Sequence, residues 1–343
     1  MKILVTGGLG YIGSHTVVEL VESGFTPILI DNLSNSYNEV YSWLEKIIGF
    51  KPEFYQIDCC NKPDLEKVFV KHPDLNGVIH FAAYKAVGES VENPLKYYTN
   101  NLGSLNVILE LMNKFQVSNL VFSSSCTVYG TPKDHIQVNE DTPLQMPNSP
   151  YGHTKFMSEQ IIKDVCNATK MKASLLRYFN PVGAHKSSKI GELPIGKPNN
   201  LVPFITQTAI GLRDKLSIFG NDYETPDGTC IRDYIHVSDL ANAHVKAINY
   251  LQTQKEKTSI FNLGTAKGNS VSEVVTAFEK ITGEKLNYEF VKRREGDVPA
   301  IYADAHKANQ LLNWSCEYSL EESMLSAWNW QKNLKKIDFK IDL

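Results

Sequence analysis

The chain has 343 residues, 42% of them hydrophobic and 21% charged, and its formal net charge is −3 at pH 7. This composition supports one large or two ordinary folded domains and excludes a largely disordered chain. With no long basic run and no apolar run of membrane-spanning length, nucleic acid and membranes are not expected partners.

A glycine-rich turn separates the first expected strand, residues 3–5, from the first expected helix, residues 11–23. Gly8, Gly10 and Gly13 match the dinucleotide fingerprint G-x-G-x-x-G, in which glycines allow a tight turn and a close approach of the backbone to a pyrophosphate. The start of the helix would direct its free N–H groups and positive dipole end at the phosphates. The alternative is a tight turn in an unrelated α/β protein.

The second expected strand, residues 27–30, ends at Asp31, which lies 18 residues after Gly13. This spacing is close to that of the acid that binds the adenosine ribose in dinucleotide-binding folds. A carboxylate there accepts hydrogen bonds from both ribose hydroxyls and repels a 2′-phosphate. The sequence therefore predicts NAD, and not NADP, as the cofactor.

Two more expected strands, residues 54–58 and 77–83, bring Asp58 and the small Ala82 and Ala83 to the same edge of the sheet. His80 is expected to be a packed, hydrogen-bonded core residue. A helix is expected over residues 92–115. Asn100 within it has a low helix propensity and indicates either a hydrogen-bonding role or an ordinary surface position.

The fifth expected strand, residues 120–122, continues into Ser123, Ser124 and Ser125. Three hydroxyl groups at the carboxyl end of a parallel strand are where a substrate is expected. A helix cap would account for one of them but hardly for all three.

Tyr151 and Lys155 lie four residues apart in an expected helix from Ser149 to Cys166, so their side chains share one face. A free phenol has a pKa of about 10 and is a poor base at neutral pH. An ammonium group beside it, with the positive nicotinamide, favours the phenolate, and Tyr151 then becomes a workable general base.

These features resemble the extended short-chain dehydrogenase/reductase family, and within it the UDP-hexose 4-epimerase branch. The matching runs lie at residues 5–16, 31–33, 80–83, 85–90, 122–125, 127–130, 149–152, 177–185, 219–223, 232–237 and 293–297. The resemblance implies a Rossmann-type doubly wound parallel sheet with a smaller α/β substrate-binding domain, and NAD that stays bound. It implies interconversion of UDP-galactose and UDP-glucose by hydride transfer from C4 through a 4-keto sugar. Ser125 would hydrogen-bond the reacting oxygen, Tyr151 would take its proton, and Lys155 would bind the nicotinamide ribose.

The resemblance also implies the binding residues. Those expected to contact NAD are Gly7, Gly10, Tyr11, Ile12, Gly13, Asp31, Asn32, Leu33, Ser34, Asn35, Ser36, Asp58, Cys59, Phe81, Ala82, Ala83, Tyr84, Lys85, Asn100, Ser125, Tyr151, Lys155 and Phe179. Those expected to contact the UDP-sugar are Lys85, Ser125, Tyr151, Phe179, Asn180, Asn199, Asn200, Leu201, Ser217, Phe219, Arg232, Arg294, Asp297 and Ile301. Guanidinium and amide groups suit a diphosphate and a uracil, although a single arginine could equally form a surface salt bridge.

The implied division places NAD binding in residues 1–180, with a return segment near 229–245, and UDP-sugar binding in residues 181–343. Amphipathic helices are expected at 271–282 and 320–330. Family members pair through the helices at about 92–115 and 151–166, so a homodimer is expected. Ile108, Met112, Phe156 and Ile161 are apolar residues beyond one helix face, unless the rest of the fold covers them.

Two rival functions are weighed against the epimerase. A 4,6-dehydratase of this fold needs an Asp-Glu pair where this chain has Cys126 and Thr127. An NAD-sensing regulator would not need Ser125, Tyr151 and Lys155. Ile301 occupies a position that is often Tyr in members restricted to plain hexoses, so UDP-N-acetylglucosamine and UDP-N-acetylgalactosamine are possible further substrates, unless neighbouring side chains refill the space.

The six cysteines show no Cys-x-x-Cys pair, and Cys59 and Cys60 are adjacent. This arrangement suits neither a zinc site nor a disulfide framework, so reduced thiols and no metal are expected. Because Met1 directly precedes the first expected strand, no signal peptide is expected. A cytoplasmic location follows as an expectation.

Overall fold

A seven-stranded parallel sheet organises the protein, in the order β12-β7-β5-β4-β1-β2-β3. The structure is a computed structural model that describes residues 1–132, 136–294 and 297–341. The strands are β1 Lys2–Thr6, β2 Thr26–Asp31, β3 Glu53–Gln56, β4 Leu75–His80, β5 Asn119–Ser125, β7 Lys172–Tyr178 and β12 Thr258–Leu263. The order reverses between β1 and β4, and ligands of such sheets bind outside the carboxyl ends of the strands at this point.

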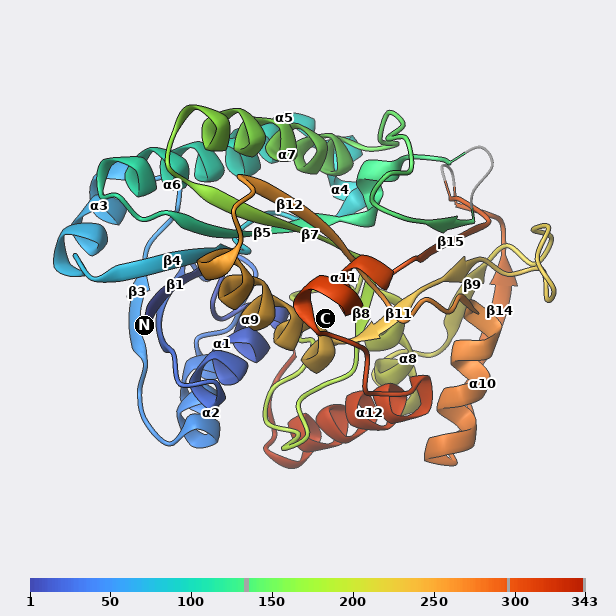
Figure 1. The fold of residues 1–343 in the computed structure, drawn as a ribbon. Coiled ribbons are helices and arrows are strands. Elements are labelled where there is room, and N and C mark those ends of the chain that lie inside the picture. The colour runs from blue at the N-terminus through green and yellow to red at the C-terminus, as the bar shows by residue number, and fades with distance from the viewer. Residues whose placement is uncertain (133–135, 295–296, 342–343) are drawn as a thin grey trace.

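Helices cover both faces of the sheet, as the doubly wound prediction requires (Figure 1). One face packs against α1 Tyr11–Glu22, α2 Glu39–Ile48, α9 Val237–Thr253 and α11 His306–Leu312. The other packs against α3 Lys62–Lys71, α6 Gly103–Lys114 and α7 Pro150–Ala168. Strand residues such as Leu4 and Val5 are fully buried because both faces are covered. No described helix is long and apolar enough to cross a membrane.

The helix expected over residues 92–115 is interrupted, and that prediction was wrong in detail. The segment contains the end of α4 Val87–Glu92, then α5 Pro94–Tyr97, a π-helical turn Tyr98–Leu102 and α6. Proline at the first position of α5 is compatible with a helix start but not with the interior of a longer helix. A π-helical turn widens the helix locally and often marks a functional site.

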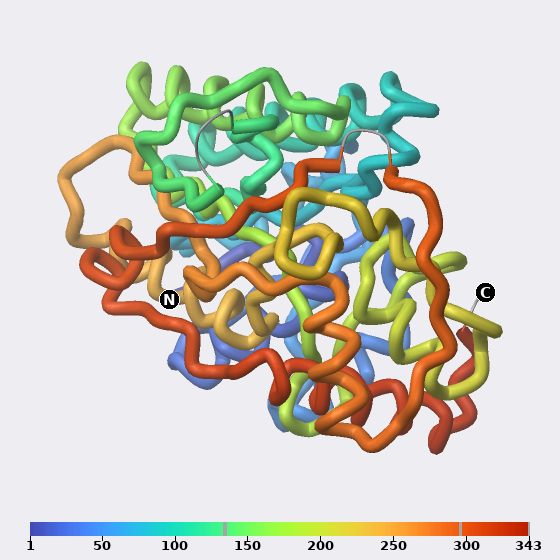
Figure 2. Tube along the Cα trace, turned by 90° about the vertical axis from the view of Figure 1, so that its right-hand side faces the viewer, coloured from blue at the N-terminus to red at the C-terminus, as the bar shows by residue number. Residues whose placement is uncertain are grey.

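A second, smaller lobe is built from short strands and three helices. Its elements are β6 Gln137–Val138, β8 Asn180–Val182, α8 Leu201–Ala209, β9 Leu216–Phe219, β10 Ile231–Arg232, β11 Tyr234–His236, β13 Asn269–Ser270, α10 Val271–Thr282, β14 Tyr288–Val291, β15 Ala300–Ala303 and α12 Leu320–Lys336. Viewed from this lobe in Figure 2, β15 passes beside the segment that contains β6, with which it pairs. A short 3₁₀ turn, Cys126–Tyr129, connects the end of β5 to this region.

The two lobes are interleaved along the chain. After β8 the chain builds part of the second lobe, and β11 then returns to pair with β8. The helix that follows, α9, packs against α1, and β12 completes the sheet next to β7. The chain therefore returns to the large sheet as far as residue 263, beyond the segment expected near 229–245.

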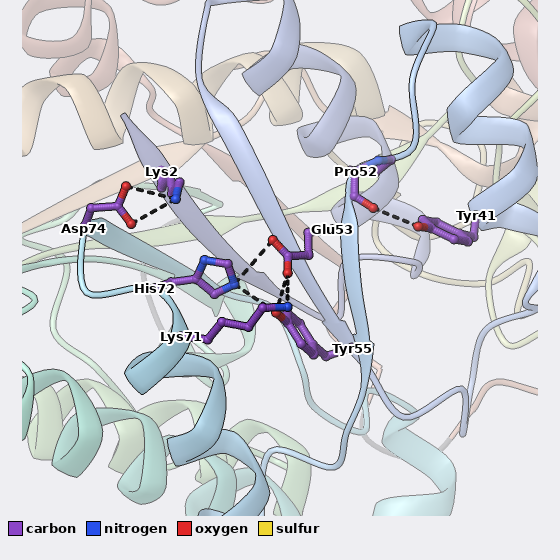
Figure 3. Close-up of polar contacts among 8 residues, drawn as sticks. All are labelled: Lys2, Tyr41, Pro52, Glu53, Tyr55, Lys71, His72 and Asp74. Carbon is purple, nitrogen blue, oxygen red and sulfur yellow. Dashed lines mark hydrogen bonds and ion pairs between the residues drawn. The ribbon is translucent and has the colours of Figure 1, made fainter.

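The edge strand β3 is held to α3 by a polar network at the end of the sheet opposite the glycine turn (Figure 3). Glu53 accepts Lys71 Nζ at 2.6 Å and the Tyr55 hydroxyl at 2.5 Å. Tyr55 Oη also lies 2.9 Å from His72 Nε2. Glu53 and Lys71 are exposed, so their ion pair adds little stability, and the contacts mainly protect the sheet edge.

Candidate active site

The glycine turn between β1 and α1 fits a bound pyrophosphate. Gly7 has φ of +69°, and a Cβ added at Gly13 would lie only 2.1 Å from the Gly7 carbonyl oxygen. Side chains are therefore excluded from this turn, and the backbone is open to close approach. Gly10 precedes α1 and contributes no side-chain cap, which leaves the N–H groups of the first turn, at Tyr11, Ile12 and Gly13, for a phosphate.

Asp31, at the end of β2, is buried beside this turn. Its carboxylate accepts the Leu9 N–H at 3.0 Å, the Leu33 N–H at 2.9 Å and the Ser36 hydroxyl at 2.8 Å. It thus holds the glycine turn and the following loop, residues 32–36, at one edge of the sheet. Asn32 extends this edge, because its amide donates to Asp58 at 2.9 Å.

The segment after β4, residues 81–85, is held by the π-helical turn. The Asn101 amide accepts the Tyr84 N–H at 2.9 Å and donates to the Tyr84 carbonyl at 3.0 Å. It also donates to the Thr154 hydroxyl on α7 at 3.1 Å. Asn100, the predicted residue, donates to the Asn101 side chain at 3.1 Å. Sequence reasoning missed Asn101, although the pair of asparagines in an apolar helix was the visible signal.

The three predicted catalytic side chains come together where β5 meets α7. Lys155 Nζ donates to the Ser123 carbonyl at 2.5 Å and lies 6.0 Å from the centre of the Tyr151 ring. Ser125 interacts with the Tyr151 hydroxyl and caps the 3₁₀ turn by accepting the Thr127 N–H at 3.2 Å. The α7 cap is Ser149, whose hydroxyl accepts the Gly152 N–H at 3.2 Å. A hydroxyl, a phenol and an ammonium group therefore share one buried site.

Burial dominates the charge states of this site. It raises the pKa of Tyr151 above the ordinary value for a phenol, and the hydrogen bond from Ser125 only partly opposes it. Burial lowers the pKa of Lys155 to about 7. Burial thus opposes both the phenolate form of Tyr151 and the charged form of Lys155, so the expected stabilisation of the phenolate requires the positive nicotinamide as well as Lys155.

The three consecutive serines do not all face one ligand. Side chains alternate along a strand, so Ser124 points away from Ser123 and Ser125. Ser123 Oγ hydrogen-bonds the Tyr178 hydroxyl, and Ser124 Oγ donates to Glu159 at 2.6 Å. The expectation of three substrate-facing hydroxyls was wrong, and only Ser125 retains that role.

His80 is the packed core residue that the sequence predicts. It is 2% exposed, and its Nδ1 lies 2.7 Å from the Thr6 hydroxyl. Burial lowers its pKa to about 3, so it stays neutral. It is therefore unsuited to proton transfer at physiological pH.

The predicted UDP-sugar residues gather in two groups of the second lobe. Arg232 Nη2 lies 3.4 Å from Asp297 Oδ1, and the Arg294 guanidinium stacks 4.0 Å from the centre of the Phe219 ring. These contacts unite β9, β10 and the segment before β15. Glu295 and Gly296, in the same family motif, lie outside the described residues.

A second group includes a carboxylate that sequence reasoning missed. Glu192 accepts Lys85 Nζ at 3.2 Å and the Asn200 amide at 2.6 Å. Its backbone carbonyl accepts the Trp330 indole N–H at 3.1 Å, and this hydrogen bond holds the loop that contains Glu192 against α12. Glu192 thus contacts predicted residues of both lobes. Because Glu192 and Lys85 are 107 residues apart in the sequence, sequence reasoning could not predict their contact.

The remaining predicted residues lie on the same elements. Ile301 and Phe179 are buried in one apolar cluster with Val128, Tyr129, Val138 and Ala303. Asn180 begins β8, Asn200 precedes α8, and Ser217 lies on β9. Leu201 is the first residue of α8, and Asn199 is exposed two residues before it. Cys59 is buried after β3.

Comparison with known proteins agrees with this architecture. A family profile described as GDP-mannose 4,6 dehydratase matches residues 4–326. A UDP-glucose 4-epimerase from Yersinia pestis is 52% identical over 332 residues, which cover 96% of this chain and 97% of that protein.

Two solved structures are similar in both sequence and fold. The UDP-glucose 4-epimerase from Bifidobacterium longum, in complex with NAD+ and UDP, has a TM-score of 0.93 and 44% identity, covering 97% of this chain and 98% of that one. The enzyme from Stenotrophomonas maltophila, with NAD and formylated UDP-arabinopyranose, has a TM-score of 0.94 and 43% identity, covering 98% and 99%. Identity at this level over nearly the full length, together with the Ser125, Tyr151 and Lys155 arrangement, shows that the chain belongs to the UDP-glucose 4-epimerase family.

Proposed function

We propose that the protein is an NAD-dependent UDP-glucose 4-epimerase that interconverts UDP-galactose and UDP-glucose. The observation that carries the proposal is the meeting of Ser125, Tyr151 and Lys155 where β5 meets α7, in a chain with 52% identity to a UDP-glucose 4-epimerase. NAD would be held by the glycine turn, Asp31 and the 81–85 segment. Arg232, Arg294 and Asn200 would hold the UDP portion.

The chain's own residues supply the proton chemistry. Bound NAD would accept hydride from C4 of the sugar and return it to the opposite face of the 4-keto sugar. Tyr151, as phenolate, would take the proton of the 4-hydroxyl group, while Ser125 hydrogen-bonds the same oxygen. Because burial opposes the phenolate, Lys155 must be protonated during this step, and its position beside the Ser123 carbonyl keeps it in the site.

A dehydratase function is disfavoured by the residues after β5. Cys126 and Thr127 stand where a 4,6-dehydratase of this fold needs an acid pair, and burial raises the pKa of the Cys126 thiol to about 11. A thiol that stays protonated is a poor base for elimination. The description of the matching family profile therefore reflects the shared fold and not a dehydratase reaction of this chain.

Purified protein should convert UDP-galactose into UDP-glucose without added reductant. In Tyr151→Phe, which keeps the ring but removes the ionisable oxygen, kcat should fall about 100- to 10,000-fold, the usual effect of losing a general base. UDP affinity, measured by calorimetry, should be preserved because the UDP contacts lie in the second lobe. Near wild-type turnover by the variant would show that another group takes the proton, and no turnover by the wild type would indicate a non-catalytic NAD sensor.

Several finer assignments belong to the same proposal. NAD binding is assigned to residues 1–180 with the returning strands, and UDP-sugar binding to most of residues 181–343. The six free cysteines suit a cytoplasmic location. A homodimer is proposed, with its interface on the side of α4, α5 and α7.

Substrate breadth depends on Ile301. Its side chain packs beside Phe179 in a buried cluster and is 6% exposed. Ile is smaller than Tyr and lacks its hydroxyl, so space for a 2-acetamido group would be gained next to the sugar. We therefore include UDP-N-acetylglucosamine and UDP-N-acetylgalactosamine as further substrates.

A further inference from the structure

A buried ion pair lies directly beneath the predicted catalytic residues. Arg177 Nε donates to Glu159 Oε1 at 2.9 Å, and Arg177 Nη2 donates to Glu159 Oε2 at 2.7 Å. Both side chains are 2% exposed. This two-point geometry fixes the guanidinium and carboxylate planes relative to each other, which a single contact would not do.

The pair is the centre of a fully buried polar network. Ser124 Oγ donates to Glu159 Oε1 at 2.6 Å, and Arg177 Nη1 donates to the Tyr129 hydroxyl at 3.1 Å. The Tyr129 hydroxyl in turn donates to the Asn262 side chain at 2.7 Å. The network therefore connects β5, the 3₁₀ turn, α7, β7 and β12.

Three members of this network, Glu159, Ser124 and Tyr129, share an element or a turn with a catalytic candidate. Glu159 lies four residues after Lys155 and eight after Tyr151, so the three side chains form one stripe along α7. Ser124 immediately precedes Ser125 in β5, and Tyr129 ends the 3₁₀ turn that Ser125 caps. A rotation or shift of α7 against β5 would thus break the network and the catalytic contacts together.

Stability alone is a weak reason for this arrangement. Removing two charges from water is costly, and apolar residues of similar volume often replace a buried ion pair without loss of stability. What an apolar pair cannot supply is a directional contact that fixes the rotation of a helix. The Lys155 contact with the Ser123 carbonyl, at 2.5 Å, depends on that rotation.

We propose that Glu159 and Arg177 are positioning residues for the reaction, acting through Ser124 and Tyr129. The ion pair fixes α7 against β5 so that Tyr151, Lys155 and Ser125 meet in the geometry of proton transfer. This inference rests on the proposed epimerase function. A displacement of about 1 Å in such a site is enough to cost about 100-fold in rate.

Tyr129→Phe is the mildest test, because it removes one hydroxyl from the network and leaves the ion pair. We expect kcat to fall about 10-fold with KM within about 2-fold, and the pH profile of kcat to shift as Lys155 and Tyr151 move apart. The matched control is Tyr41→Phe, which removes the hydrogen bond from Tyr41 Oη to the Pro52 carbonyl, 2.8 Å long, at the far edge of the sheet (Figure 3). This control should leave both kcat and the pH profile unchanged.

The double variant Glu159→Met/Arg177→Met tests the pair itself. It should bind UDP as the wild type does and retain NAD, but lose about 100-fold in kcat. Should it fail to fold, Tyr129→Phe and Ser124→Ala decide the question. The proposal would be overturned if these variants kept the kcat and the pH profile of the wild type. It would also be overturned if their Tm and kcat both fell while the pH profile of kcat stayed unchanged. Full activity in Tyr151→Phe would instead overturn the proposed function.

Discussion

At the level of single residues, the proposed range of substrates depends on Ile301. It lies on β15 next to Phe179, and a larger residue there would fill the space beside the sugar. In Ile301→Tyr, the rate of acetamido-sugar epimerisation should fall at least about 10-fold more than the rate with UDP-galactose, as expected when bulk blocks a substituent. Assays with both substrates check this. If the wild type shows no acetamido-sugar activity, Ile301 is not the gate.

Buried neutral histidines make the fold sensitive to acid. His244 is fully buried between Phe81 and Tyr178, with ring centroids 4.7 and 5.9 Å away. Burial lowers its pKa from 6.5 to about 4. Because the unfolded chain takes up the proton first, this histidine costs stability as the pH falls from 6.5 towards 4 and has no such effect at higher pH.

His244→Phe should therefore flatten the acid side of the stability profile. Between pH 7 and 4.5 the variant should lose about 2 to 3 kcal/mol less unfolding free energy than the wild type. Urea unfolding at several pH values measures the difference. If the unfolding free energy of His244→Phe depended on pH in the same way as that of the wild type, His244 would not be the source of the acid sensitivity.

At the level of elements, the apolar surface on the α7 side differs from the one expected. Ile108 and Met112 are fully buried within the chain, and Ile161 packs against the same core. Ile108 and Met112 are thus covered by the rest of the fold and do not support the dimer argument, whereas Ile161 is only partly buried. The exposed apolar residues of α4, α5 and α7 are Val87, Val91, Leu95 and Phe156, exposed by 49, 62, 77 and 37%.

These helices contact one another and lie together on one side of the molecule (Figure 1). Sedimentation equilibrium should give about twice 38.6 kDa for the wild type, and Leu95→Glu/Phe156→Glu should give the monomer mass. Leu311→Glu, a change at another exposed leucine, on α11, should leave the dimer intact. A monomeric wild type at micromolar concentration would exclude the dimer.

The sequence predicted those elements whose signals are local. Amphipathic periodicity predicted α10 with its observed bounds, and spacing linked Asp31 to the glycine turn. Pro94 was a visible sign that the 92–115 helix would break, and strand alternation could have shown that Ser124 points away. The partners of Glu159 and Lys85 could not be predicted from the sequence, because they lie 18 and 107 residues away and only the fold brings them together.

At the level of the whole molecule, both lobes contribute to one proposed site, and the cofactor should remain with the protein. The proposed NAD contacts come from the turns after β1, β2, β3 and β4, and the proposed reaction would regenerate NAD in every cycle. Denatured protein should release close to one equivalent of NAD(H) and negligible NADP(H), measured by chromatography and absorbance. Mainly NADP(H) would contradict the role of Asp31, which is expected to repel a 2′-phosphate.

The position of β12 also bears on how the chain is made. It covers the open edge of β7, yet residues 258–263 are synthesised long after the first six strands of the sheet. Until they leave the ribosome, the β7 edge has unpaired N–H and C=O groups, and Tyr129 lacks its partner Asn262. Domains usually fold as they emerge, N-terminal part first. Here the large sheet is complete only after about three quarters of the chain has been made, so its β7 edge stays open to pairing with other chains during translation.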